Sequence, residues 1–79
     1  MSTEDEVRQI VINITRTDFS HITRETDLKQ IKADSLDVMQ IVSVIEDKYG
    51  IEFSDDVMSE LITFGDIVSH AEEKLKAKV

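Results

Sequence analysis

Apolar residues recur at helical spacing in three stretches of this chain. The clearest stretch runs from about Ser35 to Tyr49, where positions three and four residues apart form one apolar face: Val38, Ile41, Val42, Ile45 and Tyr49. Gly50 follows directly and can adopt the left-handed conformation that closes a helix, with Ile51 as the apolar residue that folds back on the cap. The pattern predicts a helix that ends at Gly50.

Two further stripes flank this helix. One follows the acidic run Glu4-Asp5-Glu6 and consists of Val7, Ile10, Val11 and Ile14. The other follows Thr63 and Asp66, which have the spacing of a capping box, and consists of Phe64, Val68, Ala71 and Leu75. Between them, the segment Ser54–Ile62 begins with a capping serine and offers only two turns of helix. The chain therefore predicts an all-α fold, a small four-helix bundle with three main helices and a short third one.

The connection from Thr15 to Asp34 has no sustained period. About twenty residues is long for a loop in a compact domain, so it needs anchors or a function. Its isolated apolar residues are expected to hold it against the core: Phe19, Ile22, Leu28 and Ile31.

The start of the central helix carries candidate chemistry. Asp34 or Ser35 can accept a hydrogen bond from a first-turn N–H group, and Asp37 places negative charge where the helix dipole is positive. The same helix start would also favour a phosphate on the Ser35 oxygen, because exposed amide donors attract anions. The residues alone leave both a plain cap and an attachment site open.

The wider sequence resembles the acyl carrier proteins over nearly the whole chain. The resemblance rests on Ala33-Asp34-Ser35-Leu36-Asp37, on Tyr49-Gly50-Ile51, on Phe53-Ser54-Asp55-Asp56 and on Thr63-Phe64-Gly65-Asp66. It implies that Ser35 carries 4'-phosphopantetheine taken from coenzyme A by a phosphopantetheinyl transferase, and that Asp34, Leu36 and Asp37 complete this cofactor site. The arm would hold an acyl group as a thioester. Ser35 would then be a substrate of the transferase, and the chain would be a carrier and not an enzyme.

The chain departs from the family pattern at three positions. Lys32 stands where glycine is usual, Gln40 where glutamate is common, and Ser43 where methionine is common. None of the three touches the attachment chemistry. They leave a specialised relative open beside a carrier for fatty acid or related lipid biosynthesis.

Charge is concentrated around the candidate serine. The acidic segment, residues 34–60, holds eight acidic residues against Lys48 alone, and so carries −7 of the net −8 of the chain. Such a field repels nucleic acid and steers positively charged partners. We therefore expect acyl-processing enzymes with basic patches to dock on an apolar spot ringed by acids: Leu36, Met39, Gln40, Asp47, Asp55, Asp56 and Glu60.

Composition narrows the remaining classes. Seventy-nine residues predict one domain, residues 1–79. We also expect a monomer. No apolar run is long enough to span a bilayer and the N-terminus is acidic, so we expect a cytoplasmic protein. The absence of cysteine excludes disulfides and a protein thiol, so any thiol must come from a bound group. His21 and His70 are expected to be surface or packing residues, with no metal site and no catalytic group.

A carrier also has to shield its cargo. An aliphatic cavity that opens between the central helix and the short third helix could take in an acyl chain, with these candidates for its lining: Ile41, Ile45, Val57, Met58, Leu61 and Ile62. Plain core packing explains the same stripe.

Other functions remain open at this point. A calcium module would suit the acidity, but no loop has the alternating oxygen ligands, central glycine and final glutamate that it needs. The stronger rival is an acidic helical adaptor that never receives the arm. Among carriers, polyketide and peptidyl or aminoacyl cargo are the alternatives to fatty acid biosynthesis.

Overall fold

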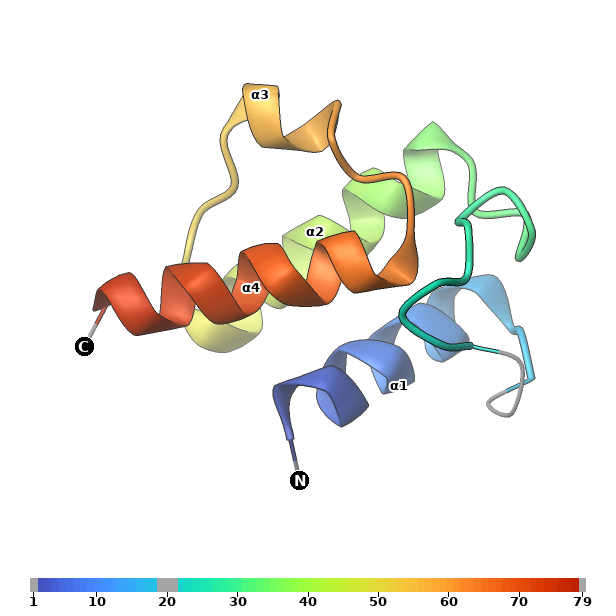
Figure 1. The fold of residues 1–79 in the computed structure, drawn as a ribbon, viewed down its shortest axis with the longest axis horizontal. Coiled ribbons are helices and arrows are strands. Elements are labelled where there is room, and N and C mark those ends of the chain that lie inside the picture. Colours follow the sequence, from blue (N-terminus) through green and yellow to red (C-terminus); the bar gives the residue numbers. More distant parts are fainter. Residues whose placement is uncertain (1, 19–21, 79) are drawn as a thin grey trace.

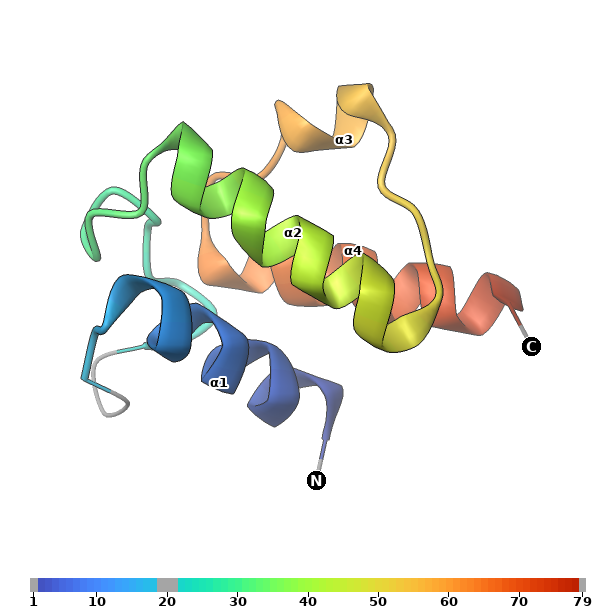
Figure 2. The same ribbon diagram turned by 180° about the vertical axis from the view of Figure 1, so that it is seen from behind.

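The structure is a computed structural model that describes residues 2–18 and 22–78. Within these residues, four helices follow one another: α1 (Thr3–Thr15), α2 (Ser35–Tyr49), α3 (Asp55–Met58) and α4 (Phe64–Lys78). Helices α2 and α4 lie between α1 and the short α3, which occupies the opposite edge of the molecule (Figure 1 and Figure 2). The predicted all-α bundle with three main helices is confirmed.

One hydrophobic core joins the three long helices. Its fully buried side chains come from all three: Val7 and Val11 from α1, Ile41 and Ile45 from α2, and Phe64, Ile67 and Val68 from α4. The helical spacing predicts six of these seven residues and misses Ile67. The connections add further buried side chains, among them Ile22 and Leu28, so the core follows only in part from periodicity. Helix α3 buries no residue completely. It therefore adds little to the core.

Both predicted ends of α2 are present. The Asp34 side chain accepts a hydrogen bond from the backbone N–H of Asp37 at 3.0 Å, so Asp34 is the N-cap. Gly50 has φ 66° and ψ 39°, and its N–H donates to the carbonyl of Glu46 at 2.8 Å. The Ile51 N–H donates to the same carbonyl at 3.2 Å, and Ile51 is buried. This is the left-handed cap with its apolar contact.

The loop of residues 16–34 is held to the segment that leads into α4. The Leu28 N–H donates to the Ile62 carbonyl at 2.9 Å, and the Phe64 N–H donates to the Thr26 carbonyl at 2.8 Å. Ile22, Leu28 and Ile31 are buried, as expected, whereas Phe19 and His21 lie outside the described residues. The long loop is therefore anchored by backbone hydrogen bonds as well as by side chains.

Gly65 is required where this loop crosses α4. Its N–H donates to the Arg24 carbonyl at 2.9 Å, and a Cβ at this position would lie 2.6 Å from that oxygen. A side chain there would push the loop away from the helix.

The third helix is shorter than predicted. The sequence favoured two turns over Ser54–Ile62, but α3 has four residues. After Met58 the Glu60 N–H donates to the Val57 carbonyl at 2.9 Å, which is the spacing of a tighter turn. The Asp66 carboxylate then accepts the N–H groups of Ile62 and Thr63, both at 2.9 Å, and draws this segment into the cap of α4.

None of the described helices combines the length and the apolar character needed to cross a membrane.

Candidate functional site

Ser35 is the first residue of α2 and is exposed. Because Asp34 supplies the cap, the Ser35 hydroxyl is not used for it. Among the described residues, no hydrogen-bond partner occupies this hydroxyl. The sequence left open which of the two residues caps the helix, and the structure assigns that role to Asp34. Ser35 is therefore free to bear a group beside the positive end of the helix dipole.

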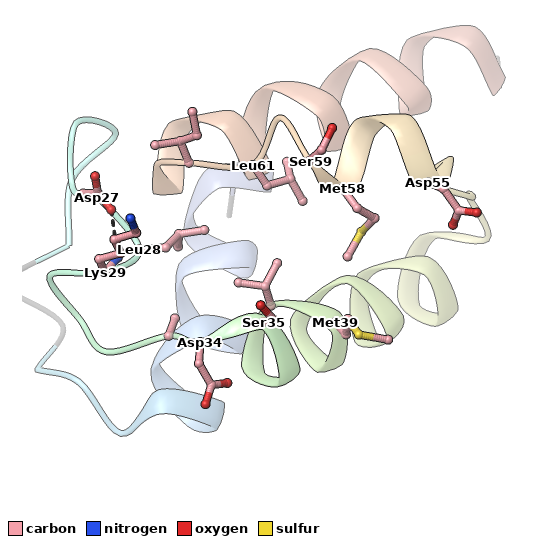
Figure 3. A pocket seen from close by; sticks show the side chains of 13 residues that line it. Asp27, Leu28, Lys29, Asp34, Ser35, Met39, Asp55, Met58, Ser59 and Leu61 are labelled. Atoms are coloured by element: carbon pink, nitrogen blue, oxygen red, sulfur yellow. Dashed lines mark hydrogen bonds between the residues drawn. The ribbon is translucent and has the colours of Figure 1, made fainter.

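A pocket of about 910 Å³ opens beside Ser35 (Figure 3). Its lining comes from the end of the long loop, the first turns of α2, and the segment from α3 to α4. The apolar part is made by Leu28, Ala33, Val38, Met39, Met58, Leu61 and Ile62, and the polar part by Asp27, Lys29, Asp34, Ser35, Asp55 and Ser59. A group attached to Ser35 would thus begin at the wall of an apolar cavity.

The predicted lining is partly wrong. Met58, Leu61 and Ile62 line the pocket as expected. Ile41 and Ile45 do not, because both are fully buried against α1 and α4 in the core. Val57 packs against the core as well, and it is not part of the lining. The pocket lies at the N-terminal end of α2, whereas Ile41 and Ile45 lie in the middle of this helix.

The sequence pattern does not predict the rest of the wall. It predicts Leu28 as a loop anchor only, and it gives Ala33, Val38, Asp27 and Lys29 no place in the cavity. Val38 lies three residues after Ser35, so both side chains share one side of the helix. That spacing could have identified Val38. Nothing in the pattern shows that Leu28 and Lys29 return to the same wall.

The residues expected to contact partners are all exposed. Leu36 is 74% exposed and Met39 is 56% exposed, so the first turns of α2 present two large apolar side chains to solvent. Gln40, Asp55, Asp56 and Glu60 are exposed around α2 and α3. Asp47 lies far from Ser35, roughly 18 Å along the helix axis at about 1.5 Å per residue. The acids therefore extend along the surface and do not form a tight ring.

Few charges in the acidic segment are neutralised. Lys48 pairs with Glu6 of α1 at 3.4 Å, and Glu60 lies 3.5 Å from His70. The Glu46 carboxylate accepts the Phe53 N–H at 2.7 Å. Among the described residues, the remaining acids of the segment form no ion pair within 4 Å: Asp34, Asp37, Glu46, Asp47, Glu52, Asp55 and Asp56. A negative surface therefore surrounds the candidate serine.

His70 has a packing role. Its ring lies 6.4 Å from the ring of Phe53 and beside Glu60, which agrees with the expectation from the sequence. His21 lies outside the described residues. Within residues 2–18 and 22–78, no cluster of three potential ligands could hold a metal ion.

The comparisons with known proteins point to one family. The family described as "Phosphopantetheine attachment site" matches residues 5–71. The acyl carrier protein of Streptococcus thermophilus is 36% identical over 76 residues, which cover 96% of this chain and 100% of the relative. The acyl carrier protein of Streptococcus pneumoniae is 34% identical with the same coverage.

Solved structures of acyl carrier proteins have the same fold as this chain. The holo acyl carrier protein of Geobacter metallireducens is 32% identical, with a TM-score of 0.84 over 99% of this chain and 91% of that one. A hexanoyl carrier of the actinorhodin polyketide synthase from Streptomyces coelicolor has the same TM-score over 95% of this chain and 92% of that one, but at 23% identity it shows the fold alone.

The structure agrees with these comparisons, because an all-helical bundle places an exposed serine at a helix start beside an apolar pocket. Acyl carrier proteins are carriers and not enzymes. The chain belongs to the acyl carrier protein family, whose members carry covalently attached 4'-phosphopantetheine. Such proteins receive the arm from a phosphopantetheinyl transferase and work with enzymes that synthesise acyl chains.

Proposed function

We propose that Ser35 is the attachment point of the arm. The observation that carries this proposal is the free, exposed hydroxyl at the start of α2, left available because Asp34 caps the helix. Attachment joins the Ser35 oxygen to the β-phosphorus of coenzyme A, breaks the bond to the bridging oxygen and releases adenosine 3',5'-bisphosphate. The hydroxyl proton passes to a base of the transferase. Asp34, Leu36 and Asp37 flank the serine and form the surface that the transferase reads.

The arm supplies the thiol that holds the cargo as a thioester, since the chain has no cysteine of its own. The pocket beside Ser35 supports shielding of an acyl chain by Leu28, Val38, Met58, Leu61 and Ile62. Burying a methylene from water stabilises the bound chain by about 0.8 kcal/mol. Met58 can adapt its unbranched side chain to chains of different shape.

Partner enzymes dock, in this proposal, on Leu36 and Met39 and on the acids around them. Exposed apolar side chains give contact area, and the surrounding negative field attracts basic patches from a distance. Gln40, Asp47, Asp55, Asp56 and Glu60 extend this surface along α2 and α3. The proposal covers a class of partners, acyl-processing enzymes with basic patches, and names no single enzyme.

The pathway we propose is fatty acid or related lipid biosynthesis. Support comes from relatives at 34% and 36% identity that are acyl carrier proteins and match along their full length. A polyketide carrier is the alternative within the family, and an aminoacyl or peptidyl carrier is a further one. We further propose that the chain forms one carrier domain, that it acts as a monomer, and that it works in the cytoplasm.

The attachment is tested with coenzyme A, magnesium and a broad-specificity phosphopantetheinyl transferase. Intact mass and peptide mapping should show one phosphopantetheine on Ser35. The Ser35→Ala variant should fold and stay unmodified, whereas Ser43→Ala, which removes another exposed serine of α2, should be modified at the normal rate. Loading of Ser35→Ala at another residue would contradict the assignment. A folded protein that takes up no arm would favour the unmodified adaptor.

The pathway needs a second experiment. The loaded protein is offered to the malonyl transferase and condensing enzyme of a fatty acid synthase, and separately to those of a polyketide synthase. Faster extension by the fatty acid enzymes is the expected result, and faster extension by the polyketide enzymes would overturn this part of the proposal.

A further inference from the structure

A positively charged side chain lies on the wall of the pocket that Ser35 shares. Among the described residues that line this pocket, Lys29 is the only lysine or arginine, and it is exposed. Figure 3 shows it beside Asp27 and Leu28 on the loop side of the pocket, with Ser35 on the facing start of α2. The chain thus places one cation at the wall of a site that is otherwise surrounded by acids.

Lys29 is also kept free of carboxylates. Elsewhere in the fold, Arg8, Arg24 and Lys48 each form an ion pair with a glutamate. Among the described residues, none lies within ion-pair distance of the Lys29 ammonium group. Asp27 is its near neighbour in sequence, but the Asp27 carboxylate accepts the backbone N–H of Lys29 at 2.8 Å and not its side chain.

The backbone holds Lys29 at this wall. The Lys32 N–H donates to the Lys29 carbonyl at 3.1 Å, and the Ala33 N–H donates to the Leu28 carbonyl at 3.0 Å. These bonds fold residues 28–33 into a turn that ends next to Asp34. Lys32 lies in the same turn and is exposed, but it is not part of the pocket lining.

We propose that the Lys29 ammonium group binds the phosphodiester of an arm attached to Ser35. This inference rests on the proposed attachment at Ser35. The phosphodiester adds a negative charge next to Asp34 and Asp37, where the nearest uncommitted cation on the pocket wall is Lys29. An ammonium group is a compact point charge that suits phosphate. The contact would fix the first bonds of the arm across the mouth of the pocket and so direct the rest of the arm.

The same ammonium group could instead bind a carboxylate at the far end of a dicarboxylic cargo. The shared chemistry is an anion carried by the arm. Three aspartates line the same pocket, so a free carboxylate that enters it meets repulsion, whereas a covalent bond would hold the phosphodiester at Ser35, on the wall that faces Lys29. We therefore assign Lys29 to the phosphodiester, and the test separates the two anions.

The experiment compares lysine acetylation in the apo protein, the arm-loaded protein and the protein loaded with a succinyl group, each verified by intact mass. Limited treatment with acetic anhydride is followed by peptide mass spectrometry, which gives the labelling rate of each lysine. Attachment of the arm alone should slow labelling of Lys29 by about threefold, within the range of an exposed ion pair. Lys32 is the internal control, and its rate should stay unchanged.

A pair of variants gives a second measurement. The change in Tm on attachment should be more negative by about 2–4 °C in Lys29→Gln than in the unaltered protein. Lys32→Gln makes the same change of charge in the same turn and should leave that difference as it is. Both side chains are exposed, so the fold tolerates either substitution.

The outcomes separate the two proposals. If Ser35 takes up no arm, the attachment and the role of Lys29 both fail. If Ser35 is loaded and Lys29 is labelled at the same rate before and after, only the role of Lys29 fails. Protection that appears only with the succinyl group would assign Lys29 to the cargo and overturn the phosphodiester contact.

Discussion

The two sides of the molecule use charge in opposite ways. On the side of α1 and α4, Glu4 accepts hydrogen bonds from Arg8 at 2.7 Å and from Arg24 at 2.6 Å, and Arg24 reaches Glu72 of α4 at 3.3 Å. The guanidinium group of Arg8 also lies 5.3 Å from the centre of the Phe64 ring. The hydrogen bond from Arg8, and then that from Arg24, hold the pKa of Glu4 below its usual value.

On the side of α2 and α3, the acidic segment carries seven net negative charges. Its single lysine, Lys48, is directed to Glu6 on α1. Like charges that stay unpaired weaken a fold but attract cationic partners. The comparison teaches that the side with α1 and α4 pairs its charges within the fold, whereas the acidic segment leaves most of its charges unpaired, where the proposed partner enzymes can reach them.

The largest contrast is expected in the core. Ile67 of α4 is fully buried, so Ile67→Ala should lower the free energy of unfolding by about 2–5 kcal/mol. Val57 of α3 is only partly buried, and Val57→Ala should cost about 1 kcal/mol at about 0.8 kcal/mol per methylene. Urea unfolding followed by circular dichroism measures both. Equal losses would show that α3 belongs to the scaffold.

Tyr49 links the two sides and should titrate abnormally. Burial, and then the nearby carboxylate of Glu6, raise the pKa of Tyr49 from 10.0 to about 12. Between pH 10 and about 12, the folded state keeps the Tyr49 proton and the unfolded state loses it. The stability that the Tyr49 proton contributes is therefore complete below pH 10 and is lost as the pH rises through about 12.

The titration can be read directly, because Tyr49 is the only tyrosine and the chain has no tryptophan. Near-ultraviolet absorbance of the phenolate should give a midpoint near 12 in the folded protein and near 10 in urea. Glu6→Gln should lower the folded midpoint. A midpoint of 10.0 in the folded protein would contradict the contact between α1 and α2.

Lys32 should be a point of strain in the turn before Ser35. Its φ of 58° lies in the left-handed region, where the close approach of the Cβ to a carbonyl oxygen destabilises the backbone by about 1–2 kcal/mol. Lys32→Gly should raise the free energy of unfolding by about 0.5–1 kcal/mol, after the greater freedom of glycine in the unfolded chain is subtracted. Lys32→Ala removes the charge but keeps the strain, so it should bring no such gain in thermal or urea unfolding.

Single charges should have the smallest effects, with opposite signs on the two sides. Asp47 lies in the last turns of α2, where the helix dipole disfavours negative charge, so Asp47→Asn should stabilise the protein by about 0.3–1 kcal/mol at low salt. Glu4→Gln should lower Tm because it breaks contacts to two arginines. High salt should shrink both effects. Shifts of the same sign would remove the contrast between the two sides.

The fold could be predicted to the extent that it depends on local rules. The bounds of α2 follow from the apolar spacing, the cap at Asp34 and the glycine at position 50, each a property of a few neighbouring residues. The length of α3 could not be read in this way. Its end depends on Asp66, which lies eight residues after Met58 and captures two N–H groups of the connecting segment.

The candidate site also has a part that depends on neighbouring residues and a part that depends on distant ones. The exposed positions of Ser35, Leu36 and Met39 at the start of α2 could be predicted, because a local motif and the polar side of one helix contain them. The pocket could not, because its wall combines the loop at Leu28 with the segment at Leu61, and no local period connects these two parts of the chain. The core positions Ile41 and Ile45 were assigned to the pocket for the same reason: spacing shows which face is buried but not what covers it.

The most direct test of the account is to locate the cargo. Amide NMR spectra are compared between the protein with the bare arm on Ser35 and the same protein with an octanoyl group on that arm. The account predicts that shifts change at the pocket wall, at Leu28, Val38, Met58, Leu61 and Ile62, while Glu4, Arg24 and Glu72 keep theirs. Changes confined to the ion pairs between α1 and α4, or no change at the pocket wall, would contradict it.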